Sequence, residues 1–177
     1  MTTIARKHIQ IQQATPDDAH AFVELLEIVD SESQFLLWEP GERELTVEQQ
    51  RTRFENAFNS STARTTLALD STNNTLVGFC WSGAGAQIRK QHEVGVAIAV
   101  LKKYHGLGVG TSLLRAQISW AREQGFRRMS LSVSTTNAAA INIYKKVGFV
   151  LEGTERDSIK LSNRYDDSHI MGLILET

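Results

Sequence analysis

The sequence predicts a single α/β domain in which helices flank a mixed β-sheet. Strand-like and helix-like segments alternate along the chain, as they do in layered folds of this class. A glycine-rich turn past the middle of the chain separates a strand pattern from a helix pattern. The 177 residues are 41% hydrophobic and 22% charged, which suffices for one substantial core, so we expect 1–177 to form one domain.

The first half of the chain combines helix-start signals with alternating strand patterns. Thr15 with Pro16 is typical of a helix start, and Thr46 with Gln49 resembles a capping box. The expected elements are a strand at 8–13, a helix that starts at Thr15 with an apolar stripe to Val29, an irregular loop at 31–45, a second helix from Thr46 to Phe58, and a hairpin of 65–69 with 76–82.

The second half contains the glycine-rich turn and two further strand–helix transitions. Met129, Leu131 and Val133 alternate along one strand face, and Gly125 is typical of the residue after a helix. The expected elements are a strand at 93–100, a helix at 111–124, a strand at 129–134, a helix capped by Thr136 or Asn137 that stops at Gly148, and strands at 149–155 and 168–175 separated by a polar turn.

Composition excludes several classes of protein. The net charge of −1 creates no strong field toward nucleic acid or an anionic membrane, so neither is an expected partner. No apolar run approaches the about 20 residues of a membrane span. The N-terminal residues lack an apolar signal core, so we expect a cytoplasmic protein. Cys80, the single cysteine, excludes an internal disulfide and a multi-cysteine metal site; it is expected to be buried and inert rather than a reactive thiol, and no metal is expected.

The glycine-rich turn at 104–111 suits phosphate binding. Glycine lets the backbone approach an anion, and the first amides of the following helix point toward it. The alternative is a plain strand–helix turn that needs glycine for its geometry. No Lys follows Gly110, which disfavours the loop of nucleotide triphosphatases, and the G-x-G-x-G spacing differs from the dinucleotide fingerprint.

A second block, at 137–149, adds a more specific signal. Together with Gly108-x-Gly110 it resembles the GNAT superfamily of acyl-CoA-dependent N-acyltransferases, over about residues 75–175. The matching positions of the second motif are Asn137, Ala140, Tyr144, Gly148 and Phe149. His105 departs from the family's Gln or Arg, but phosphate contacts come mainly from backbone amides, so binding is expected to survive. The tail at 163–171 is similar to the last hairpin of ribosomal-protein, polyamine and antibiotic acetyltransferases.

The resemblance implies a mostly antiparallel central sheet whose fourth and fifth strands splay apart. The pantetheine arm of acetyl-CoA would enter that gap, and the acceptor would be an amine of a small molecule or peptide. A homodimer is common among similar proteins, but no exposed stripe here demands one. The implied donor-binding residues are Ile98, Ala99, Val100, His105, Gly106, Leu107, Gly108, Val109, Gly110, Thr111, Asn137, Asn142 and Tyr144.

Two side chains are candidates for proton transfer. Tyr144 is the candidate general acid, because a phenol is protonated at neutral pH and can donate to a departing thiolate; alternatively it is a core aromatic. Glu93 is the candidate general base, directly or through water, because the corresponding stretch at 130–134 has no carboxylate; alternatively it is a solvent-facing strand residue. His92 also has a suitable pKa, but it points to the opposite face.

The loop after the first helix is the candidate acceptor site. The carboxylate of Glu32 would suit a cationic amine, and Phe35 and Trp38 would form an apolar wall. The alternative is a solvated acidic loop with two anchoring aromatics. The leading hypothesis is therefore an N-acetyltransferase acting by direct attack in a ternary complex. The alternatives are a non-catalytic acyl-CoA sensor and an enzyme that uses another acyl donor.

Overall fold

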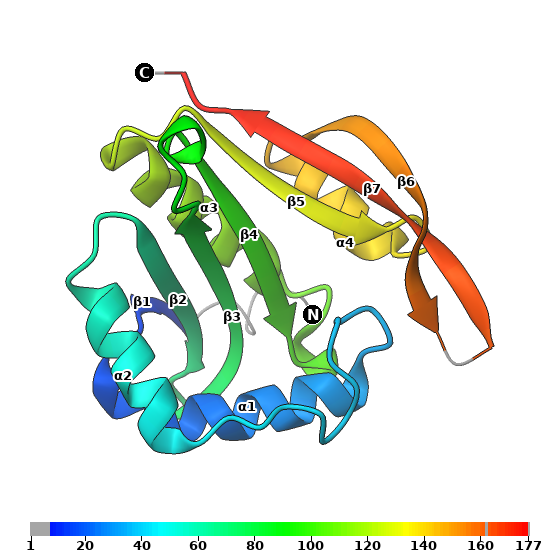
Figure 1. Cartoon of the computed structure of the whole chain (residues 1–177). Coiled ribbons are helices and arrows are strands. Elements are labelled where there is room, and N and C mark those ends of the chain that lie inside the picture. The colour runs from blue at the N-terminus through cyan, green and yellow to red at the C-terminus, as the bar shows by residue number, and fades with distance from the viewer. Residues whose placement is uncertain (1–7, 162, 177) are drawn as a thin grey trace.

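The computed structural model describes residues 8–161 and 163–176, and it shows a seven-stranded sheet in the order β1-β2-β3-β4-β5-β7-β6 with helices on both faces (Figure 1). The mixed α/β fold is thus confirmed. The strands are β1 (Ile9–Gln13), β2 (Ala63–Asp70), β3 (Thr75–Ala84), β4 (Glu93–Val100), β5 (Arg128–Ser134), β6 (Val150–Leu161) and β7 (Arg164–Ile174). The helices are α1 (Ala19–Glu32), α2 (Val47–Phe58), α3 (Val109–Glu123) and α4 (Ala138–Lys146), with 3₁₀ turns η2 (Pro16–Asp18), η3 (Ile88–Lys90) and η4 (Lys102–Tyr104).

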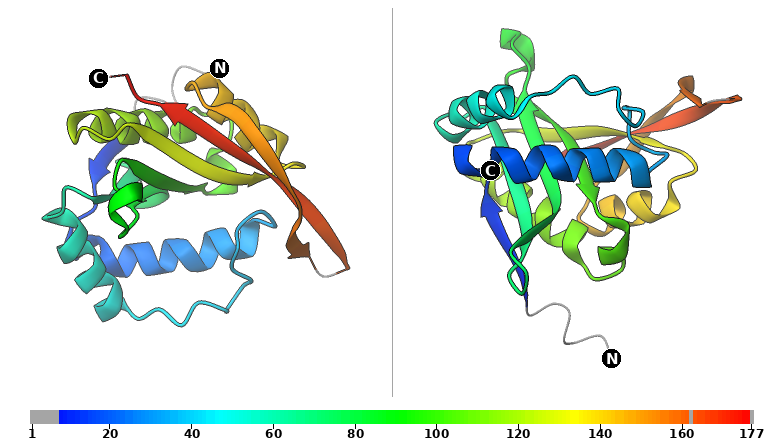
Figure 2. Two further views of the ribbon diagram at one scale, coloured as in Figure 1. Left: turned by 45° about the horizontal axis from the view of Figure 1, so that its top comes forward. Right: turned by 90° about the horizontal axis from the view of Figure 1, so that it is seen from below.

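Two apolar layers enclose the sheet, with α1 and α2 on one face and α3 and α4 on the other (Figure 2). On the α1 face, the Phe22 ring lies 5.0 Å from the rings of both Phe54 and Phe79 in edge-on contacts. On the α3 face, Leu113 and Leu114 are fully buried. Both faces of the central strands are therefore covered. Within the described ranges, no helix is both long and apolar enough to cross a membrane.

The helix boundaries follow the local signals in the sequence. Thr46 and Gln49 form the expected capping box, with each side chain bonded to the other's backbone N–H. Gly125 adopts a left-handed φ of 78° directly after Gln124, the residue that caps the C-terminus of α3. The Oδ1 atom of Asn137 accepts the Ala140 N–H at 3.1 Å, so Asn137 rather than Thr136 caps α4. The entry to α1 differs from the expectation, since a 3₁₀ turn precedes the α-helix.

The last hairpin is longer than the strands predicted at 149–155 and 168–175. β6 and β7 continue well into the region expected to be a turn. A register shift between Glu155 and Ile159 interrupts the pairing, and Asp157 adopts a left-handed φ of 51° there. Such a bulge breaks the two-residue alternation of side chains, and β6 is exposed along most of its length, so the strand signal was lost in the sequence.

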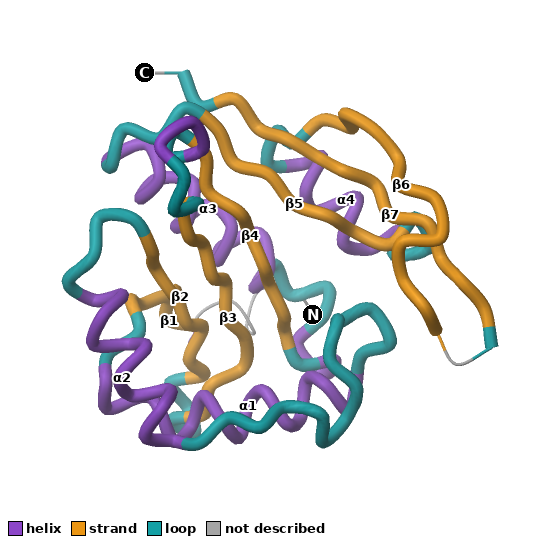
Figure 3. The backbone as a smooth tube through the Cα atoms, in the orientation of Figure 1, coloured by secondary structure: helices purple, strands orange, loops and turns teal. Residues whose placement is uncertain are grey.

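The sheet divides between β4 and β5, which form its parallel pair. Three register pairs join the two strands, from Glu93 with Arg128 to Gly95 with Ser130. Beyond them the strands diverge, while β4 stays paired with β3 to its end (Figure 3). The predicted splay is therefore present. We call the gap between Val96–Val100 and residues 131–134 the fork.

Candidate active site

The backbone of β4 offers hydrogen-bonding groups to the fork at alternate residues. The Leu101 N–H donates to the Val77 carbonyl of β3 at 2.9 Å, and the Arg128 N–H of β5 donates to the His92 carbonyl at 3.2 Å. Odd-numbered residues of β4 therefore direct their backbone groups to β3, and even-numbered residues direct theirs to the β5 side.

Ile98 and Val100 consequently direct their N–H and C=O groups to the fork side, as expected for contacts with a pantetheine arm, but the Val100 C=O already contacts His105 Nε2. Ala99 lies opposite Phe79, and its backbone groups belong to the ladder with β3. This differs from the expectation that Ala99 offers its backbone groups to the pantetheine arm. The physical reason is that backbone N–H and C=O groups alternate in direction along a strand, so three consecutive residues cannot all direct theirs to the fork.

The glycine loop between β4 and α3 has the geometry of an anion site. Gly106 and Gly108 adopt φ values of 75° and 84°, which side chains beyond glycine rarely tolerate. α3 begins directly after Gly108, so the N–H groups of Val109–Thr111 have no partner within the helix. The positive end of the helix dipole adds to these donors. A hollow of about 130 Å³ lies beside the turn.

Side chains on either side of this loop fix its path. His105 Nε2 lies 2.8 Å from the Val100 carbonyl, one of the groups that face the fork. The Tyr104 hydroxyl donates to the Asp70 carboxylate at the end of β2 at 2.8 Å, and this bond holds the Tyr104 ring against the sheet. His105 thus ties the start of the glycine loop to the end of β4.

Of the three predicted acceptor residues, one has a clear structural contact. The Glu32 carboxylate accepts the Lys102 N–H at 2.7 Å and so joins the end of α1 to η4, the 3₁₀ turn that leads into the glycine loop. Phe35 is half-buried. Trp38 is 45% exposed, and the guanidinium of Arg43 lies 5.2 Å above its ring. Glu32 therefore contacts the segment that leads into the glycine loop, whereas the contact described for Trp38 is with Arg43.

Tyr144 lies on α4 with its ring 5.8 Å from that of Phe149, and it is only 6% exposed. Burial raises the pKa of its phenol well above the usual value, as does the neighbouring Cys80 thiol. The phenol therefore keeps its proton at neutral pH. Cys80 is fully buried, as predicted, and burial raises the pKa of its thiol. Asn142 lies exposed on α4.

Glu93 lies at the closed end of the fork and is engaged by cations. Lys90 Nζ lies 2.7 Å from its carboxylate, Arg128 Nε lies 3.3 Å away, and the Ser130 hydroxyl donates to it. Burial raises the pKa of Glu93, but the hydrogen bonds from Lys90 and Ser130 and the charge of Arg128 outweigh it and lower the pKa to about 2. Glu93 is thus a fixed anion. The sequence did not single out Arg128 and Ser130 as partners of Glu93, because parallel register carries no local sequence signal. Lys90 was also missed, although it lies only three residues before Glu93.

The two candidate proton-transfer groups belong to opposite faces of the sheet. A Cβ atom added to Gly110 of α3 would lie within 4 Å of the Ile98 and Val100 side chains, so even-numbered residues of β4 point toward α3. Glu93 is odd-numbered and points to the α1 face. Tyr144 belongs to α4 on the α3 face. A donor and an acceptor can therefore reach the fork from different sides.

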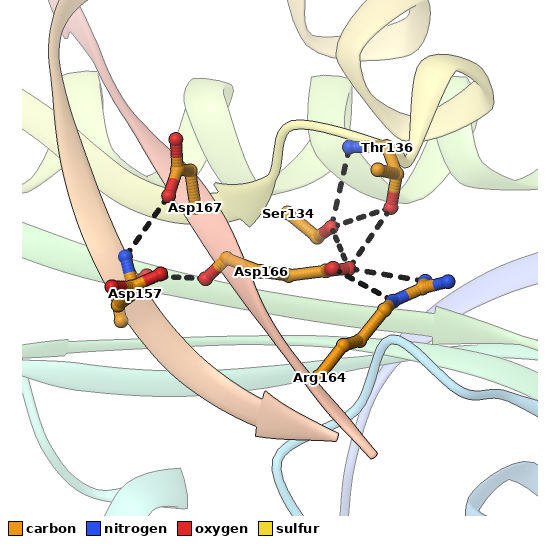
Figure 4. A network of polar contacts seen from close by, with 7 residues as sticks. Ser134, Thr136, Asp157, Arg164, Asp166 and Asp167 are labelled. Atoms are coloured by element: carbon orange, nitrogen blue, oxygen red, sulfur yellow. Dashed lines mark hydrogen bonds and ion pairs between the residues drawn. The ribbon is translucent and has the colours of Figure 1, made fainter. Parts of the chain in front are cut away.

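A buried carboxylate that the sequence did not single out holds the turn between β5 and α4 (Figure 4). Asp166 of β7 accepts hydrogen bonds from the Ser134 hydroxyl at 3.4 Å, the Thr136 hydroxyl at 3.2 Å and Arg164 Nε at 2.9 Å. Asn137 follows directly. The network therefore fixes the start of α4, which carries Tyr144. Across residues 8–161 and 163–176 no group of three His, Cys, Asp or Glu is placed to hold a metal ion.

Comparison with known proteins points to one family. The profile described as "Acetyltransferase (GNAT) family" matches residues 25–149, well over half of the chain. The structure of an acetyltransferase of the GNAT family from Streptococcus pneumoniae is 30% identical, with a TM-score of 0.90 over 95% of this chain and 99% of that one. The fold is also similar, at a TM-score of 0.84 and 19% identity, to a putative acetyltransferase, yncA, from Salmonella typhimurium with its cofactor acetyl-CoA; that match covers 96% of this chain and 95% of the other.

Among curated proteins, the L-amino acid N-acetyltransferase AaaT of Escherichia coli is 32% identical over 90 residues. The match covers 49% of this chain and 54% of that protein. The chain spans about half the length of this relative and less of the first two others that it matches.

Proposed function

Because the chain belongs to the acetyltransferase (GNAT) family and carries its acyltransferase domain, we propose that it transfers the acetyl group of acetyl-CoA to a primary amine by direct attack within a ternary complex. The observation that carries the proposal is the fork. Backbone N–H groups of β4 face it, the glycine loop at the start of α3 follows β4 directly, and the buried phenol of Tyr144 belongs to α4 on the same face of the sheet as α3. The proposal includes a cytoplasmic location, where acetyl-CoA is available.

The donor would lie on the α3 face of the fork. The amides of the glycine loop and of the first turn of α3 bind its pyrophosphate, and the backbone groups of Ile98 and Val100 align its pantetheine arm. One of the backbone N–H groups that face the fork stabilises the oxyanion formed from the thioester. These donors are main-chain groups held by the sheet, so they need no reorganisation during the reaction.

The amine would enter from the α1 face and attack the thioester carbon. As the C–N bond forms, the C–S bond breaks, and Tyr144 donates its proton to the departing thiolate to give the free CoA thiol. The amine passes its proton to the bulk solvent through water held by Glu93. With a pKa of about 2, Glu93 stays anionic and takes a proton only weakly, so its part is to hold the water and attract the ammonium form of the acceptor.

The first acceptors to test are α-amines. The name of AaaT specifies L-amino acids, and small acceptors of this kind suit the acidic Glu93 at the end of the fork. Polyamines, aminoglycosides and short peptides complete the panel, because the carboxylates of the α1–α2 loop would also suit larger cations. Thiol release from acetyl-CoA is the readout, with Tyr144→Phe alongside.

We expect turnover with one amine class and a loss of about tenfold to a thousandfold in kcat for Tyr144→Phe, the range of general acid contributions. The affinity for acetyl-CoA should stay nearly unchanged, because the substitution removes only the hydroxyl. An unchanged kcat would remove Tyr144 from the mechanism. Acetyl-CoA binding without thiol release for any amine would favour a sensor.

A further inference from the structure

Trp81 belongs to β3, which lies between β2 and β4 inside the sheet (Figure 1), yet its side chain is 43% exposed. Alternate residues of a strand share a face, so Trp81 lies on the same face as Phe79, whose ring packs against Phe22 of α1. The α1 layer therefore covers the sheet at Phe79 but leaves much of Trp81 uncovered. A tryptophan that is exposed inside a sheet, rather than at its edge, marks an opening in that layer.

The indole ring of Trp81 lies along β3, over Gly83. A Cβ atom added to Gly83 would lie 2.5 Å from Cζ2 of the ring, so the ring occupies the space that a side chain would take. Gly95 of β4 pairs with Gly83, and the nearest atom to a Cβ there, outside the adjoining residues, is the Gly83 carbonyl oxygen at 3.9 Å. Ala97, which pairs with Trp81, is exposed. The ring therefore borders an open strip of β4 formed by Gly95 and Ala97.

This strip runs along the edge of the fork. Ala97 belongs to the part of β4 that is no longer paired with β5, and Glu93 lies on the same face at the closed end. Neighbouring strands lie about 4.8 Å apart, so β3, which carries Trp81, lies about 5 Å beyond β4 as seen from the fork. The amine and the ring of 2-phenylethylamine are separated by a similar distance, about 5 Å. An amine that enters the fork can therefore lay its attached group across β4 against the indole.

The charges at the closed end of the fork favour an acceptor with a single ammonium group. Glu93 pairs with Lys90 and Arg128, and Arg128 Nη2 also lies 2.8 Å from the Glu152 carboxylate. Two carboxylates and two cations therefore balance there, and the second ammonium group of a polyamine would gain little from them. An apolar group instead gains free energy by leaving water for the surface of Trp81.

We propose that Trp81 makes the enzyme selective for primary amines that carry an aromatic or other apolar group, which packs against the indole over Gly95 and Ala97. The inference rests on the proposed function, because it concerns the acceptor of the same reaction. Contact between aromatic rings adds about two- to tenfold in affinity beyond the burial of their surface. With that burial included, the aromatic group should raise kcat/KM by about tenfold or more.

The test compares thiol release from acetyl-CoA with 2-phenylethylamine, ethylamine and spermidine. Ethylamine has the same amine without the ring, and spermidine adds charge instead of apolar surface. The wild type should prefer 2-phenylethylamine to both by about tenfold or more in kcat/KM, and Trp81→Ala should reduce this preference to about twofold or less. The control is Leu151→Ala, which removes an apolar side chain that is 53% exposed on the outer strand β6, and it should keep the preference.

A second pair of variants tests the strip without removing the indole. Gly95→Val adds a side chain to the open space beside the ring, so it should lower kcat/KM for 2-phenylethylamine more than for ethylamine. Gly153→Val is the matched control, because a Cβ atom at Gly153 of β6 would meet nothing within 4 Å, and it should keep the wild-type ratio. Neither glycine has a left-handed φ, and valine suits strands, so both variants should fold.

The outcomes separate this inference from the proposed function. Equal kcat/KM values of the wild type for 2-phenylethylamine and ethylamine, a preference for spermidine, or a preference that survives in Trp81→Ala overturns the inference while leaving acetyl transfer in place. Equal ratios in Gly95→Val and Gly153→Val contradict it as well. Absence of thiol release with any amine, although acetyl-CoA binds, overturns the proposed function itself and the inference with it.

Discussion

Two glycines offer a matched test of the donor loop. Gly106, in the loop, and Gly125, after α3, have φ values of 75° and 78°, and a Cβ atom at either position would meet nothing within 4 Å. Alanine at each site therefore adds the same strain and no clash. A non-glycine residue in this left-handed region costs about 1–2 kcal/mol. For a chain of this size we expect each variant to lower Tm by about 2–8 °C.

The two variants should differ in donor binding. Gly106→Ala relieves its strain by rotating the loop amides away from the anion, and losing one hydrogen bond to a charged partner costs about 1.5–3 kcal/mol, or about ten- to a hundredfold in Kd. Gly125→Ala leaves the loop in place, so its Kd for acetyl-CoA should equal that of the wild type. Thermal unfolding and calorimetric titration give both quantities.

The comparison can fail in two distinct ways. Equal Kd values for the two variants, with both destabilised, would mean that Gly106 belongs to a plain turn and that the loop does not hold phosphate. Full stability of either variant would refute the left-handed backbone at that position. A Gly106→Ala variant that binds weakly because it is unfolded is identified by the same unfolding curve.

Three further outcomes follow from burial and charge. The pKa of Glu93 in the folded state is lowered to about 2, so its ion pairs stabilise the fold fully above about pH 5 and lose this effect as the pH falls toward 2. The difference in Tm between the wild type and Glu93→Gln, measured in a pH series, should therefore shrink from about pH 5 to about pH 2. Phe54→Ala should destabilise by about 3–5 kcal/mol in urea unfolding, since the ring is 2% exposed, and a loss below 1 kcal/mol would contradict the packing of α2 on α1. Cys80 should react with a thiol reagent only after unfolding, and rapid labelling of the native chain would show that it is accessible.

Local signals in the sequence were enough to predict most elements. The capping box at Thr46 and the glycine after α3 work through contacts a few residues apart, so they are visible in the sequence itself. The family resemblance carried by the two spaced motifs likewise implied the splayed strands. By contrast, the strands of the outer hairpin were predicted too short, because the bulge at Asp157 interrupts the alternation of side chains that marks a strand.

The parts of the site that were not predicted depend on long-range register. Arg128 meets Glu93 only because their strands pair in parallel, and Glu32 meets Lys102 across 70 residues of chain. The two members of each pair lie far apart in the sequence. The chemistry of each side chain could therefore be predicted, but not the residue that it contacts.

The fork also leaves the sheet with the fewest backbone hydrogen bonds at the place where we propose that the donor binds. The strands β1–β4 form one block and β5, β7 and β6 form another, and three register pairs connect them. A pantetheine arm aligned along Ile98 and Val100 would occupy the position of the missing rungs, so the substrate itself would complete the ladder. The amide hydrogens of Ile98 and Val100, which face the fork, should then exchange slowly only while the donor is bound, whereas those of Ala97 and Ala99 should be protected by β3 in either state.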